Sequence, residues 1–193
     1  MLYPIFYKLE GRLVVLVGGG KLAIEKLNGL SGTGARLLVI CPDIHPEALD
    51  LCLKLKGIWK KESFNGHFPD ETTLVIAATD DPVVNGQVFQ EARRKKIPVN
   101  VADQPDLCDW YNGAVIRRGS FTLALSSSGD APSLLKWIRK ELDEQIPPDE
   151  AVFLESLKMI RDQMKEKGWT PGQRAEWFTA RFEELKKAEW VHE

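Results

Sequence analysis

Three small residues near the start of the chain carry its clearest chemical signal. Gly18, Gly20 and Ala23 follow the apolar run over residues 14–17 with the spacing Gly-x-Gly-x-x-Ala. This spacing is typical of a strand, a tight turn and a helix N-terminus that bind a dinucleotide, because side chains on the two glycines would block the turn or the pyrophosphate. The unpaired N–H groups at the start of the helix suit a diphosphate. We therefore predict a dinucleotide site, the alternative being a compact turn without a ligand.

Two aspartates follow predicted strands at positions where they could take part in the chemistry. Asp43 lies about 20 residues beyond the glycines, where dinucleotide-binding folds place an acidic residue on the adenosine ribose. It could equally cap the helix expected from Pro46. Asp103 follows a predicted strand, where a carboxylate beside a nicotinamide can accept a proton or bind a metal ion. Capping of its own loop is the alternative role for Asp103.

Polar residues in the second half of the chain are candidates for binding an anion. Ser126, Ser127 and Ser128 precede a helix expected from about residue 132, and their hydroxyl and N–H groups could hold an anion or simply cap that helix. Arg117 and Arg118 lie at a predicted hairpin turn, where a solvated turn is the default. The histidines lack the spacing of metal ligands, so no metal site is predicted. No catalytic triad can be assembled from the sequence either.

The elements that must position these residues follow from the hydrophobic pattern. Strands are expected over 12–17, 35–40, 57–62, 72–79 and 97–102, with helices over 21–32, 46–55 and 82–96. This alternation predicts an α/β fold with a Rossmann-like, doubly wound parallel sheet. A hairpin over 114–125, a helix to about 144 and helices in the tail are expected after it. The predicted domains are 1–113, 114–146 and 147–193.

Composition narrows the classes of protein that remain. The 193 residues carry a net charge of −2 and are 44% hydrophobic and 28% charged, as in ordinary globular proteins. This charge argues against a nucleic-acid partner, and no apolar run approaches the roughly 20 residues that span a bilayer. Three cysteines without C-x-x-C spacing favour a reducing compartment. No leader segment precedes the first strand, so we expect a cytoplasmic protein with no membrane partner.

A series of motifs runs in order from residue 4 to about residue 145. They are Pro4-Ile5-Phe6, Val17-Gly18-Gly19-Gly20-x-x-Ala23-x-x-Lys26, Gly34-Ala35, Ala77-Ala78-Thr79-Asp80-Asp81-x-x-x-Asn85, Asn100-Val101-x-Asp103-x-Pro105, Cys108-Asp109, Ala114-Val115-Ile116-Arg117-Arg118-Gly119 and Ser126-Ser127-x-Gly129-x-x-Pro132. Together they resemble the precorrin-2 dehydrogenase family, which includes the N-terminal module of siroheme synthase. One departure is Gly113, which stands where the family usually has proline.

The resemblance implies an activity and a set of partners. It implies NAD as cofactor for oxidising precorrin-2 to sirohydrochlorin on the route to siroheme, with ferrous iron as a further substrate in some members. It also implies a homodimer, with 114–146 as the dimerisation segment and 147–193 as a small helical domain. A non-enzymatic, NAD(H)-binding redox sensor is the alternative, which would keep the glycine turn without needing Asp103.

The resemblance also assigns residues to roles. The catalytic aspartate of the family falls on Asp103. The implied cofactor contacts are Gly18, Gly20, Lys21, Leu22, Pro42 and Asp43, to which the predicted ends of the strands add Ala78, Thr79 and Asp80. Because precorrin-2 carries many carboxylates, we hypothesise that Arg117, Arg118 and the serines 126–128 bind the substrate.

Overall fold

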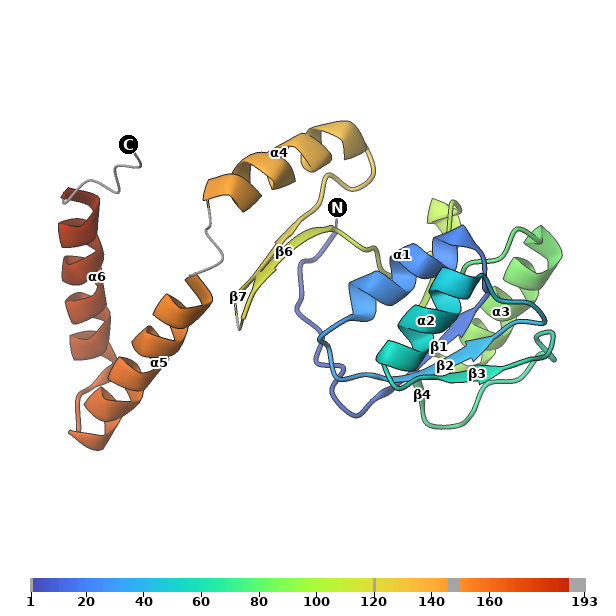
Figure 1. Cartoon of the computed structure of the whole chain (residues 1–193), viewed down its shortest axis with the longest axis horizontal. Helices are drawn as coiled ribbons and strands as arrows, with labels where there is room; N and C mark the ends of the chain where they lie inside the picture. Colours follow the sequence, from blue (N-terminus) through green and yellow to red (C-terminus); the bar gives the residue numbers. More distant parts are fainter. Residues whose placement is uncertain (1, 120, 146–149, 188–193) are drawn as a thin grey trace. The chain divides into compact units, whose positions relative to one another are not determined.

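The computed structural model describes residues 2–119, 121–145 and 150–187, and the chain in it forms two units (Figure 1). The first unit is Met1–Asn112 and the second is Gly113–Glu193. Each unit has its own secondary structure and its own sheet.

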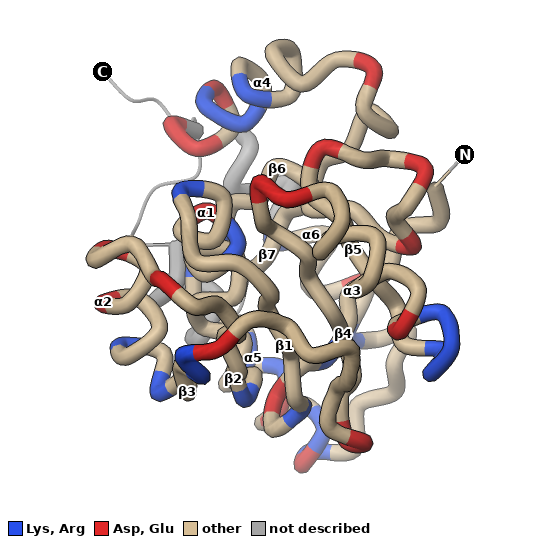
Figure 2. Tube along the Cα trace, turned by 90° about the vertical axis from the view of Figure 1, so that its right-hand side faces the viewer, with Lys and Arg blue, Asp and Glu red and all other residues tan. Residues whose placement is uncertain are grey.

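A five-stranded parallel sheet forms the centre of the first unit, and Figure 2 shows its strands side by side in the order β3-β2-β1-β4-β5. The strands are β1 (Leu13–Val17), β2 (Arg36–Ile40), β3 (Ile58–Lys60), β4 (Thr72–Ala77) and β5 (Val99–Val101). The helices that connect them are α1 (Lys21–Leu30), α2 (Pro46–Lys54) and α3 (Pro82–Lys95). The chain reverses its direction of winding at β1, as doubly wound folds do.

Apolar side chains cover both faces of this sheet. Val14 and Leu16 of β1 pack on one face with Ala23 and Leu27 of α1. Val15 of β1 packs on the other face with the α3 side chains. All five residues of β1 are buried, which explains why the central strands read as continuous apolar runs rather than alternating ones.

Helix α3 begins where the sequence places its start signals. The side chain of Asp81 accepts hydrogen bonds from the N–H groups of Val83 at 2.8 Å and Val84 at 3.4 Å, and Pro82 occupies the first helical position. The helix ends at Lys96, which adopts a left-handed conformation with φ of 58°. The preceding basic residues interact favourably with the C-terminal end of the helix dipole.

The second unit begins with a hairpin and a helix that contacts it. Strands β6 (Ala114–Arg118) and β7 (Phe121–Leu125) are antiparallel, and helix α4 (Pro132–Gln145) packs against β6. A Cβ atom at Gly113 would lie 2.5 Å from the carbonyl oxygen of Leu125. The hairpin therefore leaves no room at this position for the proline that is usual in the precorrin-2 dehydrogenase family.

Two longer helices, α5 (Glu150–Glu166) and α6 (Pro171–Lys187), follow α4 in the chain. Thr170 caps α6: its hydroxyl accepts a hydrogen bond from the N–H of Gln173 at 3.3 Å, and the Gln173 side chain accepts one from the N–H of Thr170 at 2.9 Å. This reciprocal pair is a capping box.

The predicted fold class is confirmed for the parallel sheet and its flanking helices. The short 3₁₀ helix η1 (Pro105–Leu107) was not predicted. The division of the second unit into a dimerisation segment and a helical domain stays a prediction, and residues 147–149 and 188–193 of that predicted domain lie outside the described residues. Every helix in the described ranges is too short or too polar to cross a bilayer.

The cap on α3 gives a test of this local structure. Asp81→Ala removes the side-chain oxygen that accepts hydrogen bonds from the first N–H groups of α3, so we expect it to lower the free energy of unfolding by about 1 kcal/mol. Asp80→Ala, one residue earlier, removes a carboxylate that does not cap the helix and should change the free energy by less than about 0.5 kcal/mol. Urea unfolding of both variants measures the difference, and equal losses would contradict the assignment of the cap.

Candidate functional site

Four loops meet at the carboxyl edge of the parallel sheet. They follow β1, β2, β4 and β5, and they comprise residues 18–22, 41–45, 78–81 and 102–104. Because β2, β1, β4 and β5 are neighbours in the sheet, these loops are also neighbours. In open parallel sheets this edge is where ligands bind.

The turn after β1 passes so close to the loops on either side that it has no room for side chains. A Cβ atom at Gly18 would lie 2.2 Å from the carbonyl oxygen of Ala78, at the end of β4. A Cβ atom at Gly19 would lie 2.5 Å from the carbonyl oxygen of Asp43 and 2.6 Å from the sulfur of Cys41. Gly18 also has a φ of +122°, which side chains disfavour.

The third glycine of the turn differs from the first two, because neither its backbone conformation nor a neighbouring atom excludes a side chain. Gly20 is the N-cap of α1 with an ordinary backbone conformation, and a Cβ atom there would meet no atom within 4 Å. It has no side chain with which to cap α1, so the first N–H groups of the helix keep the space in front of them open. Ala23 is fully buried, which brings α1 close to β1. A diphosphate would be accommodated by this open helix end.

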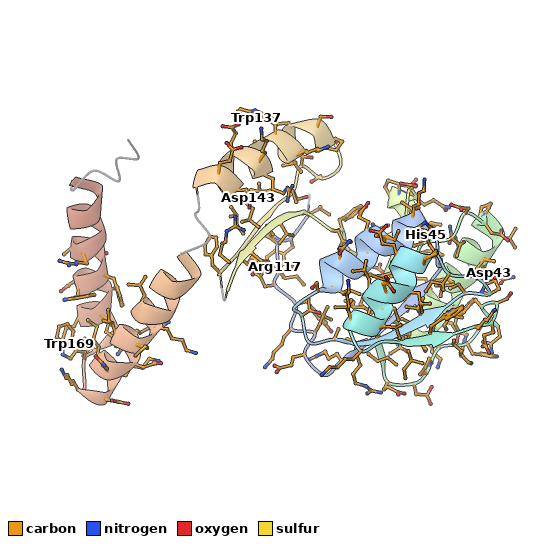
Figure 3. All side chains as sticks on the ribbon, in the orientation of Figure 1. Asp43, His45, Arg117, Trp137, Asp143 and Trp169 are labelled. Atoms are coloured by element: carbon orange, nitrogen blue, oxygen red, sulfur yellow. The ribbon has the colours of Figure 1, made fainter. Side chains whose placement is uncertain are left out.

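The loop after β2 presents an exposed carboxylate. Asp43 is exposed, and its carboxylate has no hydrogen-bond partner among the described residues. His45 is the N-cap of α2, because its Nδ1 atom accepts a hydrogen bond from the N–H of Glu47 at 3.3 Å (Figure 3). The alternative role for Asp43, as the cap of α2, is therefore wrong. The carboxylate of Asp43 could accept a hydrogen bond from a ribose hydroxyl group.

The loop after β4 is held in place by a buried side chain of α3. Asn85 is 3% exposed, and its Nδ2 group donates a hydrogen bond to the carbonyl oxygen of Thr79 at 2.9 Å. The Thr79 hydroxyl donates to Asn85 Oδ1 at 2.8 Å. These two bonds fix the loop while Ala78 is buried at its start and Asp80 stays exposed.

Asp103 lies in the loop after β5 in a strained backbone conformation. Its φ is +60°, in the left-handed region, which few residues other than glycine occupy. The side chain is exposed and makes no hydrogen bond or ion pair with the described residues. The alternative role, in which this carboxylate caps its own loop, is therefore wrong. A strained residue with an unpartnered side chain suits a functional position.

The serine-rich turn of the second unit uses two of its hydroxyl groups internally. Ser127 Oγ accepts a hydrogen bond from the N–H of Ala131 at 3.1 Å, and Ser126 Oγ accepts one from the N–H of Ser128 at 3.2 Å. Ser128 has a φ of 56°. These bonds fix the turn just before α4, as in an ordinary helix start. Ser126 and Ser128 are exposed and remain accessible to a ligand.

The two arginines of the hairpin differ in their surroundings. The Arg118 guanidinium donates to the carboxylate of Asp143 on α4 at 2.8 Å, and the Arg118 side chain is only 20% exposed. Arg117 is exposed. Both lie at the turn of the hairpin, whereas the serines follow Leu125 at its other end, roughly 13 Å away along β7. The structure therefore does not bring the predicted arginines and serines together within the hairpin.

A comparison with known families decides what class of site the first unit contains. A family model described as "Putative NAD(P)-binding" matches residues 5–114. The chain belongs to this NAD(P)-binding family. The match spans every strand of the parallel sheet and all four loops at its carboxyl edge.

Curated relatives share sequence with most of the chain. A protein named siroheme synthase from Ectopseudomonas mendocina (strain ymp) is 38% identical over 167 residues, which cover 84% of this chain and 35% of that protein. A siroheme synthase from Pseudomonas fluorescens (strain SBW25) is 40% identical over 144 residues, which cover 75% of this chain and 31% of that protein. The chain thus spans about a third of the length of these relatives.

A solved structure extends the likeness to both units. The structure named SirC, precorrin-2 dehydrogenase, has a TM-score of 0.72 with this chain and 25% sequence identity. The alignment covers 93% of this chain and 88% of the other.

Two residues that shape the NAD(P) site appear among the motifs, but the sequence analysis assigned them no role. Gly19 is packed as tightly as Gly18, although the motif treats this position as variable. Asn85 fixes the loop after β4 from within a helix. The signal for Asn85 was a polar residue three positions before Val88, on the face of α3 that packs against the sheet.

The glycines of the turn give a matched pair of tests. Gly18→Ala places a methyl group against the backbone of Ala78, so we expect the free energy of unfolding to fall by roughly 2 kcal/mol or more. Gly20→Ala meets open space, so stability should stay within about 0.5 kcal/mol. Its methyl group faces the diphosphate position and should weaken NAD binding by about tenfold.

Urea unfolding and calorimetric titration with NAD measure the two quantities on each variant. A Gly20→Ala variant that binds NAD as tightly as the natural sequence would contradict the position assigned to the diphosphate.

Proposed function

We propose that this chain oxidises precorrin-2 to sirohydrochlorin with NAD⁺ as the electron acceptor. The observation that carries the proposal is the carboxyl edge of the sheet, where the open N-terminus of α1 and the unpartnered carboxylate of Asp103 follow strands of one sheet. Relatives named siroheme synthase and a solved structure named precorrin-2 dehydrogenase support the choice of substrate.

The residues of the first unit fit NAD⁺ at this edge. The N–H groups at the start of α1 would bind the pyrophosphate, with Lys21 and Leu22 in the first turn beside it. Asp43 would accept hydrogen bonds from the adenosine ribose, next to Pro42. A carboxylate at this position repels a 2′-phosphate, which favours NAD over NADP. Ala78, Thr79 and Asp80 would line the opposite wall, held by Asn85.

Asp103 is the group that we assign to proton transfer. Oxidation removes two electrons and two hydrogens from precorrin-2. NAD⁺ supplies the acceptor for both electrons and one hydrogen. The second hydrogen leaves as a proton, which an exposed aspartate with a free carboxylate can accept. The left-handed backbone of Asp103 sets the direction in which its side chain leaves the loop, and such uncommon backbone conformations are frequent at functional sites.

The second unit carries the groups that we assign to the carboxylates of the substrate. Arg117 is exposed at the hairpin turn, and the exposed serines of the 126–128 turn lie at the other end of the hairpin. Arg118 is already paired with Asp143, so its charge is partly neutralised and its main role is to hold α4 against β6. Two binding points roughly 13 Å apart suit a large polycarboxylate better than a small acid.

Three further features belong to the same proposal. Ferrous iron is a second substrate, inserted into sirohydrochlorin after precorrin-2 has been oxidised. Anaerobic addition of iron to sirohydrochlorin tests this directly.

The active form is a homodimer in which 114–146 makes the interface. The cytoplasm is the compartment, since Cys41, Cys52 and Cys108 are all free thiols and fit a reducing environment.

Substitution of Asp103 tests the reaction. We expect Asp103→Ala to lower kcat for sirohydrochlorin formation by about a hundredfold or more, because the proton acceptor is lost. The dissociation constant of NAD should stay within about twofold, because the carboxylate does not contact the pyrophosphate. Formation of sirohydrochlorin is followed by its absorbance spectrum, and NAD binding by calorimetry.

Asp106→Asn is the matched control, because Asp106 is an exposed carboxylate in the same loop that makes no hydrogen bond or ion pair with the described residues. It should leave both quantities unchanged. A fully active Asp103→Ala variant would refute the role of Asp103. A natural chain that binds NAD but leaves precorrin-2 unchanged would favour the redox-sensing alternative.

Substitution of the hairpin arginines tests substrate binding. Arg117→Ala should raise the KM for precorrin-2 by about five- to tenfold with little change in kcat, since it removes a charge that binds substrate and transition state equally. Arg118→Ala should lower the free energy of unfolding as well, because it leaves Asp143 unpaired. Steady-state kinetics and thermal unfolding separate the two effects, and an unchanged KM in Arg117→Ala would count against the assignment.

A further inference from the structure

The outer side of β5 is covered by two consecutive residues in place of another strand. β5 is the last strand of its sheet, with β4 on its inner side. On its outer side the N–H of Asp109 donates to the carbonyl oxygen of Val99 at 2.8 Å, and Asp109 Oδ2 accepts from the N–H of Val99 at 3.1 Å. Cys108 Sγ accepts from the N–H of Val101 at 3.3 Å and donates to its carbonyl oxygen at 3.2 Å. Four outward peptide groups of the edge strand are thus satisfied by Cys108 and Asp109.

The same thiol ties the two sides of the Asp103 loop. Cys108 Sγ lies 3.2 Å from the carbonyl oxygen of Val101, before Asp103, and 3.3 Å from that of Gln104, after it. Burial raises the pKa of the Cys108 thiol, which keeps its one hydrogen in place to be donated to, or shared between, these two carbonyl groups. A left-handed aspartate persists only where its surroundings fix it, and this tie supplies such a restraint.

Asp109 connects this tie to the body of the first unit. Its Oδ1 atom lies 2.7 Å from Nη1 of Arg93 in the last turn of α3. The Arg93 guanidinium in turn lies over the ring of Phe89, 5.0 Å from its centroid. Both carboxylate oxygens of Asp109 are therefore in use, one on the edge strand and one on α3. The ion pair between Asp109 and Arg93 therefore anchors the far end of the loop that follows β5 to helix α3.

We propose that Cys108 and Asp109 are positioning residues that hold the Asp103 loop, and through it the carboxylate of Asp103. The inference rests on the proposed function for the role of Asp103, whereas the restraint on the loop is independent of it. Neither side chain needs to touch the substrate for this effect. Loss of the thiol leaves the N–H of Val101 without its partner, and loss of the carboxylate leaves the N–H of Val99 without one. Either loss makes it easier for Asp103 to leave its left-handed conformation.

Amide hydrogen exchange tests the restraint on the full-length protein. Cys108→Ala and Asp109→Ala should each speed exchange in the segment 98–111 by about tenfold, with the rest of the first unit unchanged. Cys52→Ala, which truncates a fully buried thiol of α2, and Asp106→Asn are matched controls that should leave this segment unchanged. Unchanged exchange in 98–111, or equal acceleration throughout the first unit, would overturn the proposal.

Kinetics test whether the restraint acts through Asp103. In both variants kcat for precorrin-2 oxidation should fall by about tenfold, while KM and the dissociation constant of NAD stay within about twofold. Cys108→Ser should recover most of the loss, because a hydroxyl group both donates and accepts. An unchanged kcat beside faster exchange, or no recovery by serine, would overturn the positioning role. A natural chain inactive on precorrin-2 would overturn the proposed function alone, and exchange would still decide whether these residues hold the loop.

Discussion

The first unit depends on how closely the turn after β1 approaches its two neighbours. Gly18 presses against the carbonyl group of Ala78 on one side, and Gly19 against the carbonyl group of Asp43 on the other. Only a chain without side chains at both positions can pass between the ends of β4 and β2. That passage brings α1 to the carboxyl edge with its first N–H groups exposed, and it sets the loops that carry Asp43 and Thr79 beside them.

Features of the fold and of the site that depend on residues close together in the sequence could be predicted. The apolar runs gave the buried strands, because residues enclosed by helices on both faces of a parallel sheet have no polar side. The spacing of Gly18, Gly20 and Ala23 gave the strand, turn and helix. The start of α3 at Asp81 and the capping box at Thr170 followed from pairs of residues two to three positions apart. In each case the partners in the interaction are local, so one stretch of sequence contains both.

What escaped prediction depends on partners distant in sequence or on a side chain replacing a backbone group. The motif leaves Gly19 variable, whereas its constraint comes from Asp43, 24 positions later. Arg118 pairs with Asp143, 25 residues away, which no charge pattern in the hairpin reveals. Which residue caps α2 depends on where the chain leaves β2, and the backbone places His45 rather than Asp43 at that point. The thiol of Cys108 takes the place of a strand, which composition alone does not signal.

The first unit thus prepares its site in two opposite ways, one at the carboxyl end of β1 and one along the outer side of β5. At α1 the chain leaves N–H groups without partners, so that a ligand can take them. At β5 it satisfies the outward N–H groups with Cys108 and Asp109, and we propose that these contacts restrain the loop that follows. A binding surface gains from open donors, because they contribute to affinity for an anion. A group that moves a proton gains from a fixed orientation, because misplacement by about 1 Å costs rate. Under the proposed function, the open backbone groups at α1 would hold the cofactor, and the satisfied groups at β5 would fix the residue that takes part in the reaction.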